Sequence, residues 1–173
     1  TAIFPFPMRV SLQPAAADDA PAIARIRNEV SADLTERHGP GPWSGRGTEK
    51  GVLFDHRHSH LYVARRRGEI VASLVLATKK PWAIDRSFFT PCQRPLYLTG
   101  MVVAPAFQRR GLGRQCLVAA EAIARRWPAD AIFLDAYEGS GGAGPFYAKC
   151  GYREVGRKTY RGAPLIYFEA LLG

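Results

Sequence analysis

Cysteine is scarce in this 173-residue chain, and its three positions exclude the usual cysteine-based sites. Cys92, Cys116 and Cys150 are widely spaced and form no CxxC pair, so they predict neither a disulfide framework nor a zinc site. No apolar run approaches the roughly 20 residues that a membrane-spanning helix needs. With 17 glycines and 13 prolines, the composition is also unlike that of fibrous or low-complexity proteins. We therefore expect a globular cytoplasmic protein with no membrane partner.

Signal-peptide features are absent from the first residues of the sequence. Residues 1–7, TAIFPFP, lack the basic start and the long apolar core of a secretory signal. Because Met8 is a candidate natural start, we expect residues 1–7 to be a foreign or disordered leader. Residues 8–173 then suit one domain, since domains typically hold about 100–200 residues.

Lysine is also rare, although the chain is strongly basic. Five of the 24 basic residues are lysine, which leaves 24 − 5 = 19 arginines, and the formal net charge is +9. Guanidinium groups favour planar contacts with phosphate or carboxylate. This excess leaves three explanations open: a nucleic-acid surface, a phosphate-bearing ligand, or an arginine-rich surface with no single partner. Residues 108–126 hold five arginines and one glutamate, so they carry 5 − 1 = 4 of the net charges.

The apolar pattern predicts alternating helices and strands, and therefore an α/β (α+β) fold. In the first helix, Ile23, Ile26, Val30 and Leu34 share one face. Helices are expected from a cap at Asp18 or Asp19 to Gly39, over residues 48–55, from 111 to 127, and over 141–149. Strands are expected over residues 9–12, 61–64, 70–76, 96–103, 131–136, 152–159 and 165–171.

A glycine-rich turn, Gln108–Gly113 (QRRGLG), lies between an apolar strand and the third helix. Glycine lets the backbone approach an anion closely, and the first amides of a helix point outward without a partner. Together with the helix dipole, these amides form a seat for a pyrophosphate. The turn is not a P-loop, because no Gly-Lys-Ser/Thr follows, and it lacks the three-glycine spacing of the dinucleotide fingerprint.

The residues around this turn resemble a known family. Met101–Pro105 (MVVAP) followed by Gln108–Gly113 is similar to the acetyl-CoA-binding core of the GCN5-related N-acetyltransferases (GNAT). A second match lies downstream, where Phe146–Tyr152 (FYAKCGY) resembles the family's FYxKxGF segment. The resemblance spans about residues 96–152. It implies a mixed, mostly antiparallel sheet that is flanked by helices and splayed between the fourth and fifth strands.

The resemblance also implies acetyl-CoA as co-substrate, no metal, and a set of binding residues. The pantetheine arm would lie between the splayed strands, and the amides of the glycine-rich turn would hold the pyrophosphate. Ser140 stands where the family often has asparagine. The residues expected to bind the cofactor are Met101, Val102, Val103, Gln108, Arg109, Arg110, Gly111, Leu112, Gly113, Arg114, Ser140 and Phe146.

Tyr147 occupies the family's general-acid position, where a phenol with a pKa of about 10 is protonated at neutral pH. The general base stays unassigned. Many family members carry a carboxylate on the fourth strand, but residues 96–103 contain none, and Thr99 and Gly100 stand at the expected place. Asp135 and Glu138 are lesser candidates for the base.

Two other groups of residues carry weaker signals. His56, His58 and His60 alternate along the chain, but no carboxylate completes a known metal-binding spacing, so we expect solvated histidines and no metal. The family's variable loops line the acceptor side, and here they carry aromatic residues that would suit either an acceptor pocket or lids over an edge of the core. These candidates are His38, Trp43, Trp82, Phe88 and Phe89.

The sequence thus predicts an acetyl-CoA-dependent N-acetyltransferase that acts by direct transfer in a ternary complex. The expected acceptor is a primary amine on a small molecule or a peptide terminus, and the enzyme would be a monomer or a homodimer. One alternative is acetylation of an RNA-bound amine such as aminoacyl-tRNA, although a nucleic-acid partner is not favoured. Another is a non-catalytic CoA-binding module, which the missing strand carboxylate would suit.

Overall fold

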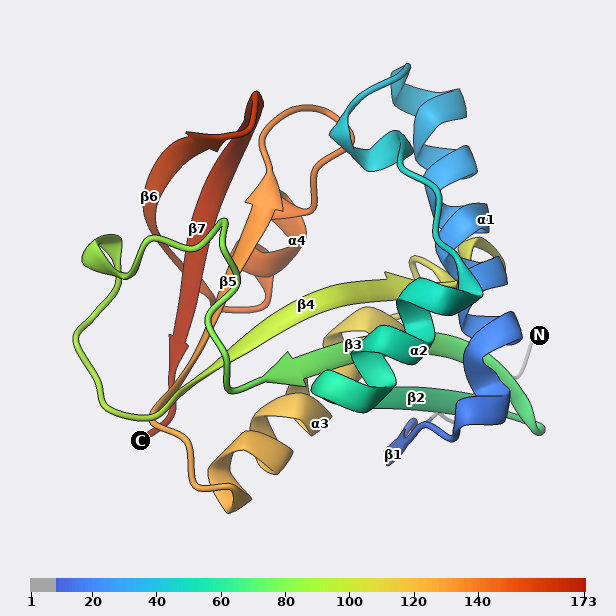
Figure 1. Ribbon diagram of the computed structural model, residues 1–173, viewed down its shortest axis with the longest axis horizontal. Coiled ribbons are helices and arrows are strands. Elements are labelled where there is room, and N and C mark those ends of the chain that lie inside the picture. Colours follow the sequence, from blue (N-terminus) through green and yellow to red (C-terminus); the bar gives the residue numbers. More distant parts are fainter. Residues whose placement is uncertain (1–8) are drawn as a thin grey trace, which may run out of the picture.

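The computed structural model describes residues 9–173 (Figure 1), so the expected leader at residues 1–7 lies outside the described part. Helices cover both faces of one seven-stranded sheet. The strands are β1 (Leu12–Pro14), β2 (His60–Arg66), β3 (Glu69–Ala77), β4 (Pro95–Val103), β5 (Ala131–Tyr137), β6 (Arg153–Tyr160) and β7 (Ala163–Leu171). The α-helices are α1 (Ala20–His38), α2 (Glu49–His58), α3 (Leu112–Arg126) and α4 (Gly144–Lys149).

The elements predicted from the sequence are confirmed, although most of their bounds shift by one to three residues. The first strand begins at Leu12 rather than at residue 9, because the Val10 amide donates to the side chain of Gln115 in α3 instead of to a strand. The last short helix begins at Gly144 rather than at residue 141, with Pro145 in its first turn. No helix in residues 9–173 is long and apolar enough to cross a membrane.

The sheet is antiparallel except at its centre, where β4 and β5 run parallel. The strand order is β1-β2-β3-β4-β5-β7-β6. Pairing between β4 and β5 covers only Pro95–Tyr97 and Ala131–Phe133, although both strands continue beyond these residues. The strands therefore separate toward their carboxyl ends, which confirms the expected splay.

A β-bulge in β4 accompanies the separation. Ser73 of β3 lies opposite Val102, and Val75 lies opposite Thr99, so β4 has one more residue than β3 in this interval. Gly100 takes up the extra residue with a φ of +57°, a left-handed conformation that glycine adopts without steric cost. Because a bulge bends its strand and increases the local twist, it turns the end of β4 away from β5.

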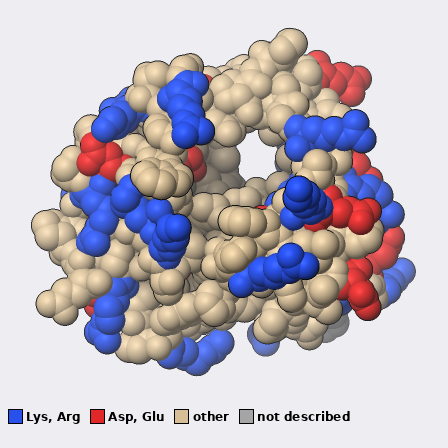
Figure 2. All heavy atoms as spheres, in the orientation of Figure 1, with Lys and Arg blue, Asp and Glu red and all other residues tan. Residues whose placement is uncertain are grey.

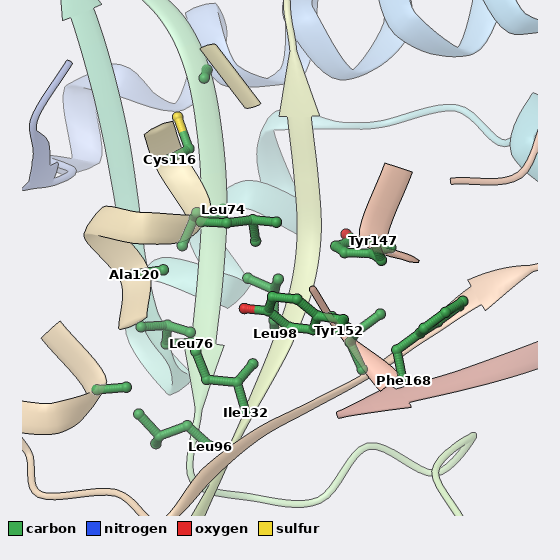
Figure 3. Close-up of a cluster of buried hydrophobic side chains, with 14 of the residues drawn as sticks. Leu74, Leu76, Leu96, Leu98, Cys116, Ala120, Ile132, Tyr147, Tyr152 and Phe168 are labelled. Carbon is green, nitrogen blue, oxygen red and sulfur yellow. The ribbon is translucent and has the colours of Figure 1, made fainter. Parts of the chain in front are cut away.

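Two hydrophobic clusters attach the helices to the sheet. Helices α3 and α4 pack on one face of the sheet, and α1 and α2 pack on the other. Figure 3 shows the α3–α4 side, where Cys116 and Ala120 of α3 lie among leucines of β3 and β4. Cys116 is only 1% exposed, and burial raises the pKa of its thiol to about 11. Cys116 is therefore a core residue, as its helical position predicts.

The loop between β3 and β4 covers a third cluster. Phe89 is buried and stacks on Phe133 with their ring centroids 4.3 Å apart, whereas the Trp82 side chain is 82% exposed. The buried carboxylate of Glu169 in β7 fastens this loop, because it accepts hydrogen bonds from the amide and the hydroxyl of Thr90. Phe89 therefore completes the core instead of lining an acceptor pocket.

Candidate functional site

The separation of β4 and β5 opens a cleft made of two connected cavities. One cavity, of about 550 Å³, lies beside the amino end of α3, and the other, of about 460 Å³, lies beside α1 and the segment that follows it. Figure 2 shows the cleft as an opening through the molecule. The lining residues that the two cavities share are Val30, Leu34, Met101, Val102, Gly141, Gly142, Ala143 and Tyr147.

Helix α1 supplies one wall of the cleft through the apolar face that the sequence predicts. Ile23 and Ile26 are buried against the sheet, and Val30 and Leu34 further along the same face line both cavities. The first half of the helix therefore anchors it, and the second half borders the cleft.

The amino end of α3 points free backbone amides at the larger cavity. Gly111 caps the helix with a φ of +76°, and Arg109 before it also has a positive φ, +60°. Within residues 9–173, no backbone acceptor bonds the amides of residues 109–114. A Cβ placed on Gly111 would meet no atom within 4 Å, so the space above the turn is open. Such a turn can seat an anion.

Most of the expected cofactor-binding residues meet at this cavity. Its lining includes Met101, Val102, Val103, Gln108, Arg109, Gly111, Leu112, Gly113, Arg114 and Phe146. The side chain of Gln108 donates to the Val103 carbonyl at 2.9 Å, which fixes the turn to the end of β4. Two expected residues lie elsewhere: the Arg110 guanidinium lies over the Phe107 ring, and Ser140 is exposed on its loop and lines neither cavity.

Tyr147 of α4 stands at the junction of the two cavities. Its hydroxyl lies 3.8 Å from the Met101 sulfur, and the residue is only 7% exposed. Burial raises the pKa of the phenol strongly, and the nearby Asp135 carboxylate raises it further. The phenol therefore keeps its proton throughout the neutral range, so it can act as a proton donor.

Asp135 of β5 contributes a carboxylate to the smaller cavity. Burial raises its pKa above the ordinary value of 3.8. The other acidic candidate, Glu138, lies outside both cavities and forms an ion pair with Arg157 at 2.6 Å. Thr99 and Gly100 also line the smaller cavity, so the wall that β4 contributes has no carboxylate of its own.

Trp43 lines the smaller cavity on the side of the α1–α2 connection. It lies in the short helical turn η2 (Pro42–Ser44) between α1 and α2, and its indole nitrogen donates to the Gly39 carbonyl at 2.9 Å. Its ring lies so close to Gly41 and Gly141 that a Cβ on either would come within 2.6 Å and 2.5 Å of ring atoms. The ring therefore holds the α1–α2 connection against the loop after β5.

Two arginines of the smaller cavity were not predicted from the sequence. Arg27 of α1 forms an ion pair with Asp55 of α2 at 2.9 Å and lies beside Gly100. Arg46 lies on the α1–α2 connection and is exposed. The sequence pattern that could have identified Arg27 is its position on the apolar face of α1, between Ile23 and Val30, where a charged side chain is unexpected.

The three alternating histidines lie apart from the cleft. His58 packs against Phe54 with ring centroids 4.4 Å apart, and His60 packs against Trp127 at 4.5 Å. Among residues 9–173, no group of three or more His, Cys, Asp or Glu side chains is arranged to hold a metal ion.

A family comparison agrees with this geometry. The model of the acetyltransferase (GNAT) family matches residues 23–152, which is more than half of the chain. The chain belongs to the GNAT family. The match runs from the first turn of α1 to Tyr152, just after α4. A search of curated proteins finds no match to this chain.

Solved structures share the GNAT fold over almost the whole chain. A GCN5-related N-acetyltransferase from Rhodopseudomonas palustris has a TM-score of 0.73 and 20% identity, covering 95% of this chain and 97% of its own. The ribosomal-protein-S18-alanine N-acetyltransferase of Escherichia coli has a TM-score of 0.65, 17% identity and 94% coverage of both chains. A putative acetyltransferase of Salmonella typhimurium, yncA, solved with acetyl-CoA, has a TM-score of 0.67 and 17% identity, covering 96% of this chain and 95% of its own.

Replacement of Gly141 by alanine should destabilise this GNAT domain. The new methyl group would lie 2.5–2.9 Å from the Trp43 ring, so the ring or the loop must move. Overpacking of this kind costs about 1–3 kcal/mol. Urea denaturation followed by tryptophan fluorescence would measure the loss. Gly45→Ala is the matched control, since a Cβ there meets nothing within 4 Å and its φ is −63°. Equal stability of the two variants would contradict the packing described for Trp43.

Proposed function

We propose that residues 8–173 act as one acetyl-CoA-dependent N-acetyltransferase domain, which transfers the acetyl group directly to a primary amine while both substrates are bound. The observation that carries the proposal is the pair of cavities that meet at Tyr147, one beside the free amides of α3 and one beside α1. Strands β1, β6 and β7 lie at or beyond the ends of the matched region but join the same sheet, which supports one unit.

The larger cavity fits acetyl-CoA. Beyond Tyr97 the edge of β4 has no partner on β5, so Met101 and Val103 can bond the pantetheine arm as an added strand. The amides of residues 109–114 would hold the pyrophosphate, and Arg109 and Arg114 add positive charge beside it. Bound acetyl-CoA supplies a thioester carbon that an amine can attack.

Tyr147 would act as the general acid. When the new C–N bond forms and the C–S bond breaks, the sulfur takes up a proton, and the protonated phenol at the junction can donate it. The contact between its hydroxyl and the Met101 sulfur shows that the hydroxyl faces the end of β4, beside the expected path of the pantetheine.

Asp135 is our candidate for the general base, directly or through a water molecule. It is the one carboxylate among the described lining residues of the smaller cavity, and its raised pKa makes it a stronger base than an ordinary aspartate. The proton that the amine loses would go to Asp135 while Tyr147 gives its proton to sulfur. One carboxyl group and one phenol, which both line the smaller cavity, would thus divide the proton transfers.

The alternatives have less support. A non-catalytic CoA-binding module would not need an acid and a carboxylate beside the junction. An RNA-bound amine would have to enter a cavity of about 460 Å³, a size that suits small ligands.

The Gly111→Glu variant should lose affinity for acetyl-CoA. Any side chain at Gly111 is strained by the positive φ, and glutamate also places negative charge beside the pyrophosphate. Gly111→Gln has the same size without the charge. Calorimetry should show a loss for glutamate that exceeds the loss for glutamine by about ten-fold at low salt, with the difference shrinking as salt rises. Equal affinities of the two variants for acetyl-CoA would mean that the pyrophosphate does not bind beside Gly111.

Tyr147→Phe should lower kcat by roughly a hundred-fold, the usual scale of general-acid catalysis, while the dissociation constant for acetyl-CoA changes only a few-fold. Tyr152→Phe is the control, because its buried hydroxyl lies outside both cavities. Steady-state kinetics with thiol detection would measure both. Full activity in Tyr147→Phe would remove the phenol from the mechanism.

Asp135→Asn should abolish the acidic limb of the pH–rate profile. The carboxylate must be deprotonated to accept a proton, so kcat should fall as the pH falls through its pKa, at a higher pH than an ordinary aspartate would set. The other titratable or charged groups of this cavity are Arg27, Arg46, Tyr137 and Tyr147. Glu138→Gln removes a carboxylate outside the cavities and should keep the wild-type profile. An unchanged profile in Asp135→Asn would mean that another group is the base.

A further inference from the structure

Charge is distributed unevenly across the smaller cavity. Arg27 and Arg46 stand on the wall that α1 and the α1–α2 connection form, and Asp135 stands on the wall that β5 forms. These three are the charged side chains among its described lining residues. The rest of the lining is uncharged: it includes the apolar or aromatic Val30, Leu34, Leu98 and Trp43, and the hydroxyl groups of Ser31, Thr99 and Tyr137. An acceptor in this cavity therefore faces positive charge on one side and a carboxylate on the other.

Arg46 is an exposed lining residue of the cavity, and hydrogen bonds to α1 fix the residues on both sides of it. The Asn28 side chain bonds both the amide and the carbonyl of Gly47, at 2.8 and 3.0 Å, and Ser31 donates to the Gly45 carbonyl at 2.9 Å. The backbone on both sides of Arg46 is thus fixed to α1. Its own guanidinium forms no ion pair with any residue of 9–173, so it can take an anion from solution.

Arg27 is less exposed than Arg46, and its ion pair with Asp55 uses only part of the hydrogen-bonding capacity of the guanidinium group. One terminal nitrogen donates to Asp55 at 2.9 Å, while its buried Nε has no partner within residues 9–173. A guanidinium carries five N–H donors, and buried donors without partners are costly. Its side chain is 17% exposed and lines the cavity, so part of the group remains available to a ligand there.

We propose that the acceptor is a small amine that also carries a carboxylate, of the amino-acid type, with its carboxylate at Arg27 and Arg46 and its amine toward Asp135 and Tyr147. This assignment rests on the acetyl transfer proposed above. Guanidinium groups bind carboxylates with paired, charge-assisted hydrogen bonds, and the opposite wall suits an ammonium group before it loses its proton. A peptide terminus has an amide in place of this carboxylate, so it would offer these arginines no second anion.

Matched acceptor pairs test the proposal. The pairs are free amino acids and their amides, with apolar, aromatic and polar side chains, assayed with acetyl-CoA by thiol release and by mass detection of the acetylated product. We expect the acid to exceed its amide at least ten-fold in kcat/KM. This preference is informative because the amide has the less basic amine, and at neutral pH more of it is already neutral. Amides or carboxyl-blocked peptides used as well as the acids would overturn the proposal.

Substitutions at Arg46 and Arg27 test whether these two residues cause the preference for the acid over its amide. Arg46→Gln should raise KM for the acid about five-fold or more and leave KM for the amide unchanged. The ratio of kcat/KM between acid and amide should therefore fall. Arg57→Gln is the matched control, since Arg57 is an exposed residue of α2 outside the cavity. Arg27→Lys tests the deeper group while keeping a charge for Asp55. A preference that survives in Arg46→Gln and Arg27→Lys would overturn the assignment of these residues.

A binding measurement separates this proposal from the proposed activity. Calorimetry with N-acetyl-leucine and N-acetyl-leucinamide requires no turnover. Tighter binding of the acid than of the amide, with this difference reduced in Arg46→Gln, would support the carboxylate site. If no amine were acetylated as well, only the proposed acetyl transfer would be refuted. Equal binding of the two probes, or binding of neither, would overturn the carboxylate site even if other amines were acetylated.

Discussion

The bulge at Gly100 is the constraint on which the cleft depends. A continuous ladder between β4 and β5 would fill the centre of the sheet and leave no space for a ligand. The two strands pair at three positions only, up to Tyr97, and the extra residue at Gly100, with a φ of +57°, then bends the rest of β4. The free edge of β4, the amides of α3 and the hydroxyl of Tyr147 then face one space. A side chain at Gly100 would be strained and would also crowd Arg27.

The cleft passes through the sheet, and this arrangement separates two kinds of recognition. On the side of α3, backbone amides and arginines provide a seat for phosphates. On the side of α1, the lining combines apolar side chains with two arginines and one aspartate. The proposed acid stands between the two spaces and the proposed base stands on the acceptor side. The phosphate seat depends on backbone geometry, whereas the acceptor side depends on individual side chains.

Much of the fold could be predicted from the sequence, because apolar periodicity and turn residues act locally. The helix over 111–127 and the strand over 96–103 follow from such patterns. The acceptor side could not be predicted in this way, since Arg27, Arg46 and Asp135 come from three separate elements and meet only in the folded chain. Phe89 shows a second limit: an aromatic residue in a long loop suits either an acceptor pocket or a lid over the core, and the structure places it on Phe133 in the core. Exposed loops and buried lids share the same composition, so only packing distinguishes them.

A crystal structure with CoA bound would test the central claim most directly. The account predicts that the pantetheine arm lies in the gap between β4 and β5 and bonds the backbone of Met101 and Val103. The pyrophosphate should then lie against the amides of residues 109–114, and the sulfur should point toward the Tyr147 hydroxyl. CoA bound elsewhere on the protein, with the gap free of it, would contradict the account.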